Sequence, residues 1–320
     1  MTRTAMKGAV VVGVDGSAPS EAALRWACDE AARRKVDVVA VFVAPVFVPS
    51  EWGNVVAPPE AEGQRMLEDM VRRVPHDGVT VHRVVRVAPP VLSLRAEAVR
   101  HDASLLVVGR RGAGRLRRLV IGSVSAGLAQ NPVRPLIIVP SIDGQPPAPL
   151  GPSSRILVGV DGSAPSLVAL RWAAEEAERR DTTAEAVYAW SFPHLDLLPL
   201  LPPTHDNVTV LHARAKEALA HELAELPPRY RERVEPRLRK GDAAEVLLRL
   251  ASKADLVVVG TRGQGFVRQH VLGSTSNAVL HHCKAALAVI PSGEHVDAGE
   301  HAGTDALGEP GALAGSDLAH

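Results

Sequence analysis

Aromatic side chains are scarce in this chain of 320 residues, where Phe, Trp and Tyr together make up 3%. Hydrophobic residues still reach 46%, so alanine, valine and leucine must supply most of the core packing. At this length the chain is expected to form two domains of ordinary size.

Cysteine is also rare, and positive and negative side chains are equal in number. The two cysteines, Cys28 and Cys283, form no CxxC pair, which argues against a disulfide framework and favours a reducing compartment. Lys plus Arg and Asp plus Glu both number 36, so no global field attracts nucleic acid or an anionic membrane. Neither a signal-peptide pattern nor an apolar run of the roughly 20 residues of a membrane span is visible. We therefore expect a cytoplasmic protein that binds neither nucleic acid nor membrane.

An internal repeat is the dominant feature of the sequence. The segment Val12–Ser20 returns unchanged as Val158–Ser166, and each copy continues into Ala-Leu-Arg-Trp-Ala. A period of about 150 residues is too long for a solenoid unit and indicates two duplicated domains. We predict a first domain over 1–140, a Pro-rich linker over 141–154, a second domain over 155–291 and a disordered tail over 292–320.

Apolar runs alternate with amphipathic segments in both copies. In the first copy, strands are predicted at 9–14, 36–43, 79–87, 104–108 and 135–139, and helices at 20–34, 60–74, 91–100 and 123–130. In the second copy, strands are predicted at 156–160, 184–189, 234–238, 255–259 and 286–290, and helices at 166–180, 208–226, 243–252 and 275–282. This alternation predicts an α/β fold with two tandem, doubly wound, mostly parallel five-stranded sheets that carry helices on both faces.

A glycine pattern, G-x2-G-x9-G-[ST], follows the fourth predicted strand of each copy. It consists of Gly109, Gly112, Gly122 and Ser123 in the first copy, and of Gly260, Gly263, Gly273 and Ser274 in the second. Glycine lets the backbone approach a ligand closely, and the start of a helix presents free N–H groups and the positive end of its dipole. The alternative is a pair of ordinary tight turns. Because the pattern occurs twice in the same context, we favour a duplicated phosphate site.

An aspartate follows the first predicted strand of each copy, at Asp15 and Asp161. In a parallel sheet of this kind, ligands bind beyond the carboxyl ends of the strands, where these aspartates and the glycine loops can meet. The alternative is that each aspartate only forms an Asp-Gly turn. We favour a role in ligand binding.

Other motifs give weaker signals. No GxxxxGK[ST] sequence occurs, and the arginine-rich segment 110–118 has no interleaved aromatic residues, so a P-loop and a nucleic-acid site are not predicted. His281, His282 and Cys283 are adjacent on a predicted helix and point to different sides, so no metal site is predicted there.

On these residues the sequence resembles the universal stress protein family in its tandem, ATP-binding form. The resemblance rests on the Val-Gly-Val-Asp-Gly-Ser start, the two glycine patterns and the final strands that end in Pro140 and Pro291. It covers about residues 10–140 and 155–291 and implies a Rossmann-like fold of the adenine-nucleotide alpha-hydrolase type.

The resemblance also implies the ligands, ATP and Mg²⁺, and one site in each copy. The first site would consist of Gly13, Asp15, Val43, Val108, Gly109, Arg111, Gly112, Gly122, Ser123, Val124 and Ser125. The second would consist of Gly159, Asp161, Ala189, Val259, Gly260, Arg262, Gly263, Gly273, Ser274, Thr275 and Ser276. In this assignment the aspartates lie near ribose, phosphates or Mg²⁺, Val43 and Ala189 meet the adenine edge, and the Gly-Ser segments bind phosphates through N–H and hydroxyl groups.

Two functions follow from the resemblance. The first is an ATP-binding stress-response regulator that acts on an unknown protein partner, with the strands at 136–139 and 287–290 paired as an internal pseudo-dimer and a homodimer as a further expectation. The alternative is a slow ATPase or phosphotransferase. Phosphoryl transfer needs a positioned base or a water-orienting residue, and no His or Glu recurs at both sites, so efficient turnover is not expected.

Overall fold

The computed structural model describes residues 5–44, 60–110, 121–141, 145–191, 205–261 and 272–292. Two halves follow one another with the same order of elements. The first half comprises β1 (Val10–Val14), α1 (Ala18–Arg34), β2 (Val38–Ala44), α2 (Glu60–Arg73), β3 (Val81–Val87), α3 (Pro90–Arg100), β4 (Leu105–Gly109), α4 (Ser123–Gln130) and β5 (Leu136–Val139). The second half comprises β6 (Ile156–Val160), α5 (Ala164–Arg179), β7 (Ala184–Trp190), α6 (His205–Ala224), α7 (Pro228–Arg231), β8 (Val234–Lys240), α8 (Ala243–Ala251), β9 (Leu256–Gly260), α9 (Ser274–His282) and β10 (Ala286–Ile290). All strands and helices predicted from the sequence are present with small shifts of their ends, and α7 is additional.

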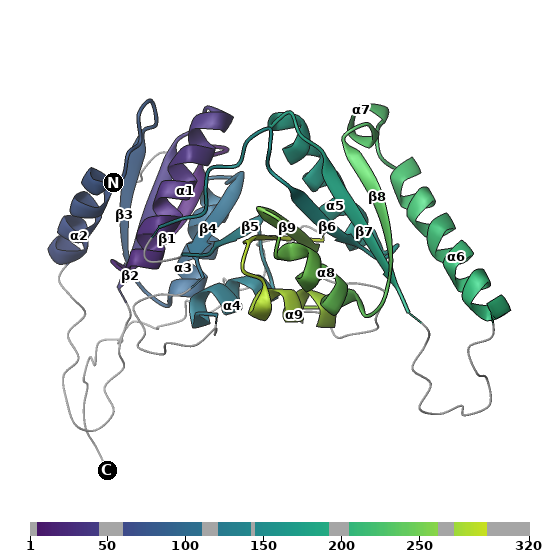
Figure 1. The fold of residues 1–320 in the computed structure, drawn as a ribbon. Coiled ribbons are helices and arrows are strands. Elements are labelled where there is room, and N and C mark those ends of the chain that lie inside the picture. The colour runs from purple at the N-terminus through teal and green to yellow at the C-terminus, as the bar shows by residue number, and fades with distance from the viewer. Residues whose placement is uncertain are drawn as a thin grey trace, which may run out of the picture.

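The strands form one ten-stranded sheet in the order β3-β2-β1-β4-β5-β10-β9-β6-β7-β8 (Figure 1). Within each half all neighbouring strands are parallel. The predicted α/β class and the doubly wound parallel arrangement are therefore confirmed, and the two five-stranded sheets are joined edge to edge.

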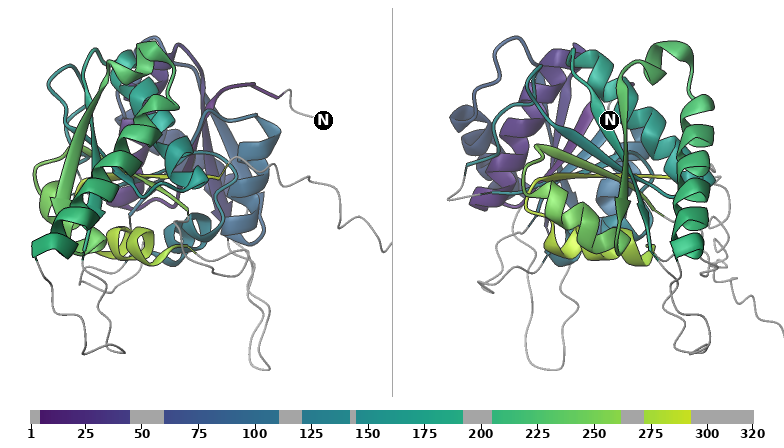
Figure 2. Two further views of the ribbon diagram at one scale, coloured as in Figure 1. Left: turned by 90° about the vertical axis from the view of Figure 1, so that its right-hand side faces the viewer. Right: turned by 45° about the vertical axis from the view of Figure 1, so that its right-hand side comes forward.

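Helices cover both faces of this sheet (Figure 2). Successive strand residues point to opposite faces, so Val10 and Val12 belong to one core cluster and Val11 to the other. Residues of α1, α2, α5, α6 and α7 pack in the first cluster, and residues of α3, α4, α8 and α9 pack in the second. Burial on two faces explains why the central strands are almost continuously apolar. Of the helices in the described ranges, none has the length and hydrophobicity that a membrane crossing requires.

The two halves meet where β5 pairs with β10, the one antiparallel pairing recorded between the strands of the described ranges. Leu136 lies opposite Val289, and Ile138 lies opposite Leu287. All four side chains are buried. The predicted pairing of the terminal strands between the halves is confirmed, and it removes two apolar edges that would otherwise be open to other chains.

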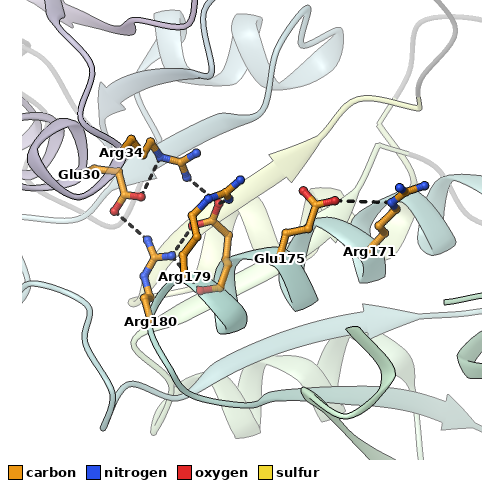
Figure 3. Close-up of polar contacts among 7 residues, drawn as sticks. Glu30, Arg34, Arg171, Glu175, Arg179 and Arg180 are labelled. Carbon is orange, nitrogen blue, oxygen red and sulfur yellow. Dashed lines mark hydrogen bonds and ion pairs between the residues drawn. The ribbon is translucent and has the colours of Figure 1, made fainter. Parts of the chain in front are cut away.

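A buried ion-pair network joins α1 and α5 above this seam (Figure 3). Glu30 pairs with Arg34 on α1 at 2.8 Å, and Glu176 pairs with Arg180, which caps the end of α5. The pairs also cross the seam: Arg34 lies 2.6 Å from Glu176, and Arg180 lies 2.7 Å from Glu30. Burial alone would raise the pKa of Glu176, but the guanidinium groups of Arg34, Arg180 and Arg179 lower it below its ordinary value. The repeated Glu and Arg positions thus pair across the seam in both directions, and Arg179 adds a further pair to Glu176.

Candidate functional site

The candidate site in each half lies where the order of strands reverses. In the first half, β1 lies between β2 and β4, with Val12 opposite Val107 and Gly13 opposite Val108. In the second half, β6 lies between β7 and β9 in the same way, with Val158 opposite Val258. The connection from β1 passes over one face of the sheet and the connection into β4 passes over the other, and in open α/β sheets ligands bind at the carboxyl ends of the strands at such a point. The prediction that Asp15 and Gly109 reach the same sheet edge is therefore confirmed.

The junction between strand and helix is the same in both halves. The amide of Gly122 donates to the carbonyl of Arg110 at 2.8 Å, and the amide of Gly273 donates to the carbonyl of Thr261 at 2.9 Å. The hydroxyl of Ser125 donates to the Gly109 carbonyl at 2.7 Å, and the hydroxyl of Ser276 donates to the Gly260 carbonyl at 2.7 Å. Each helix is thus anchored to the end of its strand before its first turn is complete.

This anchoring uses the hydroxyl groups of Ser125 and Ser276. Both side chains are buried, and their hydroxyl hydrogens are used inside the fold. These hydroxyls hold the helix to the strand, and the contact with phosphate that the resemblance implies for them stays a prediction. The backbone N–H groups of the first helical turn are what remains, because a helix leaves them without partners inside the helix.

The first turns of α4 and α9 suit an anion. Each helix begins after a glycine N-cap, Gly122 or Gly273, that makes no side-chain capping bond. The next residues, Ser123 and Ser274, are exposed. An uncapped and accessible helix start presents N–H groups and the positive end of the helix dipole.

Asp15 and Asp161 each form a turn with the serine two residues later. Oδ1 of Asp15 accepts from the Ser17 amide at 3.0 Å and from the Ser17 hydroxyl at 2.5 Å. Oδ1 of Asp161 accepts from the Ser163 amide at 3.1 Å. The turn-forming alternative is therefore present in the structure. A carboxylate has about four lone-pair sites, so the turn does not exclude a ligand role.

Gly13 and Gly159 have a packing reason for being glycine. A Cβ on Gly13 would lie 2.9 Å from Cδ1 of Leu94 on α3, and one on Gly159 would lie 2.8 Å from Cδ1 of Leu247 on α8. Real Cβ atoms essentially never come this close, so either side chain would force the leucine or the helix to move. These two glycines position α3 and α8 against the sheet next to the site.

The remaining predicted residues fall into two groups. One group is described by the structure. Val43 and Ala189 are partly buried near the ends of β2 and β7, and Val108 and Val259 are buried in β4 and β9. Val124 and Thr275 are partly buried in the first turns of α4 and α9. Arg111, Gly112, Arg262 and Gly263 lie outside the described residues, as do the tail beyond Ser292 and part of the linker. Among the described residues, no group of three or more His, Cys, Asp or Glu side chains is placed to hold a metal ion.

Comparison with known proteins assigns this arrangement to a family. The model of the universal stress protein family matches residues 6–140 and 152–291. The chain belongs to this family. Universal stress protein Rv2005c of Mycobacterium tuberculosis is 32% identical over 304 residues, which cover 90% of this chain and 99% of that protein.

Solved structures agree on the fold. A universal stress protein from Archaeoglobus fulgidus superposes with a TM-score of 0.60 at 18% identity, covering 89% of this chain and 98% of that chain. A universal stress protein in complex with cAMP matches over 41% of this chain and 96% of that chain, at 25% identity and a TM-score of 0.31. The match to the Archaeoglobus fulgidus protein alone shows that the tandem fold of this universal stress protein is shared.

Glu222 is a residue near the second site that the sequence pattern did not single out. It lies on α6 and is 4% exposed, and its Oε2 accepts from the Gly162 amide at 3.2 Å. Its Oε1 makes a short hydrogen bond with the Ser166 hydroxyl. Buried helix positions 63, 67 and 70 of the first half recur as 215, 219 and 222, so the counterpart of Glu222 is Met70. Aligning the two copies at α2 and α6 would have revealed this difference.

The environment of Glu222 favours its neutral form. Burial raises the pKa of Glu222, and the charge of Asp161 adds to the rise, while the bonds with Ser166 and Gly162 oppose it. The Ser166 hydroxyl also donates to the Ser163 carbonyl at 2.9 Å, as the Ser20 hydroxyl does to Ser17 in the first half. A hydroxyl has one hydrogen, so a protonated Glu222 satisfies both contacts at once.

Proposed function

We propose that this universal stress protein binds ATP in each half and acts as a nucleotide-dependent stress-response regulator of a protein partner. The observation that carries the proposal is the duplicated junction at the switch point of the strands. In both halves an uncapped helix begins at a Gly-Ser step and is anchored to the preceding strand by a serine–carbonyl bond of 2.7 Å. Two copies of one anion-binding geometry fit two phosphate chains.

The residues present fit this ligand. The amides of Ser123 and Val124 in the first half, and of Ser274 and Thr275 in the second, would hold phosphate oxygens. Asp15 and Asp161 would lie beside ribose or Mg²⁺, which commonly takes one or two carboxylates together with substrate phosphates. Bound Mg²⁺ would neutralise part of the phosphate charge. Val43 and Ala189, at the ends of β2 and β7, would border the adenine.

A second candidate function is slow ATP hydrolysis or phosphoryl transfer. Glu222 favours it in the second half, because the raised pKa of this carboxyl beside the Asp161 turn makes its ionised form a stronger proton acceptor than an ordinary glutamate. The first half has Met70 at that position, so such chemistry would be confined to one site. Turnover faster than about 1 s⁻¹ would support an enzyme over a regulator.

The test of ATP binding uses the purified chain. Copurified nucleotide is identified by mass and absorbance, and ATP with Mg²⁺ is then titrated by calorimetry, with cAMP as a second nucleotide. We expect Gly122→Trp to remove the first site and Gly273→Trp to remove the second, each leaving the other site filled.

A matched control is available in Gly151→Trp. A Cβ at Gly151 meets no atom within 4 Å, so this variant adds the same bulk away from both sites. Unchanged stoichiometry in the Gly122 and Gly273 variants would show that the phosphates are wrongly placed. Absence of adenine nucleotide binding in the wild-type chain would overturn the function itself.

A further inference from the structure

Residues of the first half hold both ends of α9, the helix at whose start the second site lies. Near the end of α9, the carbonyl of Leu280 accepts from Nη2 of Arg110 at 2.8 Å. Just before its start, the amide of Leu272 donates to Oε1 of Gln130 at 3.3 Å. Arg110 follows β4, and Gln130 is the last residue of α4. In both figures of the ribbon α4 and α9 lie side by side below the seam (Figures 1 and 2).

Arg110 connects the start of α4 with the end of α9. Its backbone carbonyl accepts from the amide of Gly122, the N-cap of α4, at 2.8 Å. Its backbone amide donates to the Val139 carbonyl at 2.8 Å, which fixes the residue to β5. One residue of the first glycine pattern therefore supports the start of α4 with its backbone and the end of α9 with its side chain.

This support runs in one direction. By the spacing of the glycine patterns, the counterparts of Arg110 and Gln130 are Thr261 and His281. Within the described ranges, the recorded bonds of Thr261 stay in the second half, and His281 contacts the ring of His282. Neither residue makes a recorded hydrogen bond to the first half. Within the described residues, these two positions therefore hold a helix of the other half only in the first copy.

We propose that Arg110 and Gln130 are positioning residues through which the first site controls the nucleotide affinity of the second. Leu272 and Leu280 are both buried, so α9 has little freedom to settle elsewhere while these bonds hold. The amide of Gly122, the N-cap of α4, donates to the Arg110 carbonyl, so a shift of the start of α4 on phosphate binding would reach α9 through the Arg110 side chain. The affinity part of this inference rests on the proposed ATP binding, whereas the placement of α9 does not.

The placement of α9 is tested without nucleotide, by amide hydrogen exchange. The variant Arg110→Thr introduces the residue type found at the equivalent position of the second half, Thr261. The control, Arg83→Thr, makes the same substitution at an exposed arginine of β3. We expect faster exchange in α9 for Arg110→Thr and no change for Arg83→Thr. Unchanged α9 exchange in Arg110→Thr overturns the positioning role, whether or not the chain binds ATP.

The coupling between the sites is tested by measuring the ATP affinity of the second site in two states. In one state the first site is filled with ATP, and in the other it is blocked by Gly122→Trp. We expect the two affinities to differ by about fivefold or more in the wild-type chain, the lower end of typical coupling between sites. In Arg110→Thr the ratio should fall to about one, and Arg110→Lys, which keeps a cationic donor, should restore part of it. The weaker bond of Gln130 predicts a smaller effect for Gln130→His.

The outcomes separate this inference from the proposed function. A chain that binds ATP at both sites with a ratio of one, or that keeps its ratio in Arg110→Thr, contradicts the coupling and leaves the function intact. A chain that binds no adenine nucleotide contradicts the function and with it the coupling, while the exchange experiment still decides the placement of α9.

Discussion

The turn after β1 and the turn after β6 have the same sequence and share the bonds from Ser20 and Ser166 to the turn serines, but they face different neighbours. In the first half, Gly16 lies against the side chain of Met66, and a Cβ there would be 3.6 Å from its sulfur. In the second half, the amide of Gly162 donates to the buried carboxyl of Glu222. Because the serine bonds of the turn are present in both halves, Glu222 is not needed to form it.

The comparison shows how a duplicated fold acquires a difference between its halves. The turn, the helix caps and the strand ends are local, and both copies preserve them. The differences fall on residues that contact the turn or the helix from another element, such as Glu222 on α6 and Arg110 from the other half. The two candidate sites therefore share their local backbone structure and differ in the side chains that contact it from other elements.

The largest effect is expected at the ion-pair network over the seam. Glu176 is fully buried and pairs with three arginines, Arg34, Arg179 and Arg180, whereas Glu30 pairs with two of them. Glu176→Ala should lower the free energy of unfolding by about 3–5 kcal/mol, because buried guanidinium groups lose their counter-charge. Urea denaturation measures the loss.

The counterpart Glu30→Ala serves as the comparison. It should cost less, because Glu30 pairs with two arginines, whereas Glu176 pairs with a third, Arg179. An equal or larger loss for Glu30→Ala would show that the network is balanced about the seam and that Glu176 is not its centre.

An intermediate effect is expected when the two halves exchange Met70 and Glu222. Met70→Glu places a carboxyl in a fully buried position of the first half and should cost about 1–3 kcal/mol. Glu222→Met should change how stability depends on pH. In the native wild type the pKa of Glu222 is raised above its ordinary value of 4.5, so the folded chain binds this proton more tightly than the unfolded chain.

The sign of the pH effect follows from that raised pKa. As the pH rises through 4.5 towards the folded pKa, wild-type stability falls, and above the folded pKa the penalty is complete. The unfolding free energy of Glu222→Met minus that of the wild type should therefore become more positive over this window and then level off. Urea denaturation from acid to neutral pH measures it. A difference that stays constant with pH would show that Glu222 titrates alike in the folded and unfolded chains.

The smallest effect is expected at the helix caps, where the halves agree. Ser17 accepts from the Ser20 amide at 3.3 Å, and Ser163 accepts from the Ser166 amide at 3.3 Å. Ser17→Ala and Ser163→Ala should each cost about 1 kcal/mol, the usual worth of such a cap. Thermal or urea unfolding of the two variants should give the same loss within error. A clearly larger loss for Ser163→Ala would mean that Glu222 adds to the second cap.

The sequence alone determined the elements and the edge where the candidate sites lie. Buried parallel strands need continuous apolar runs, and amphipathic helices need a 3.6-residue period, so both can be recognised locally. The repeat then placed Asp15 and Gly109, and Asp161 and Gly260, at matching strand ends, and the observed neighbours β1 and β4 agree. The short helix α7 was not predicted, because its four residues make barely more than one turn and show no repeating period.

Only the tertiary structure decided which distant groups meet. Glu222 lies 56 residues from Ser166, and Arg110 lies 170 residues from Leu280. Hydrophobic periodicity specifies which face of an element is buried and leaves open which polar group that face will meet. For the same reason the sequence did not reveal that the Ser125 hydroxyl donates to the carbonyl of Gly109. The glycine loops are thus a local property of the chain, and the bonds from the first half to α9 are a property of the assembled sheet.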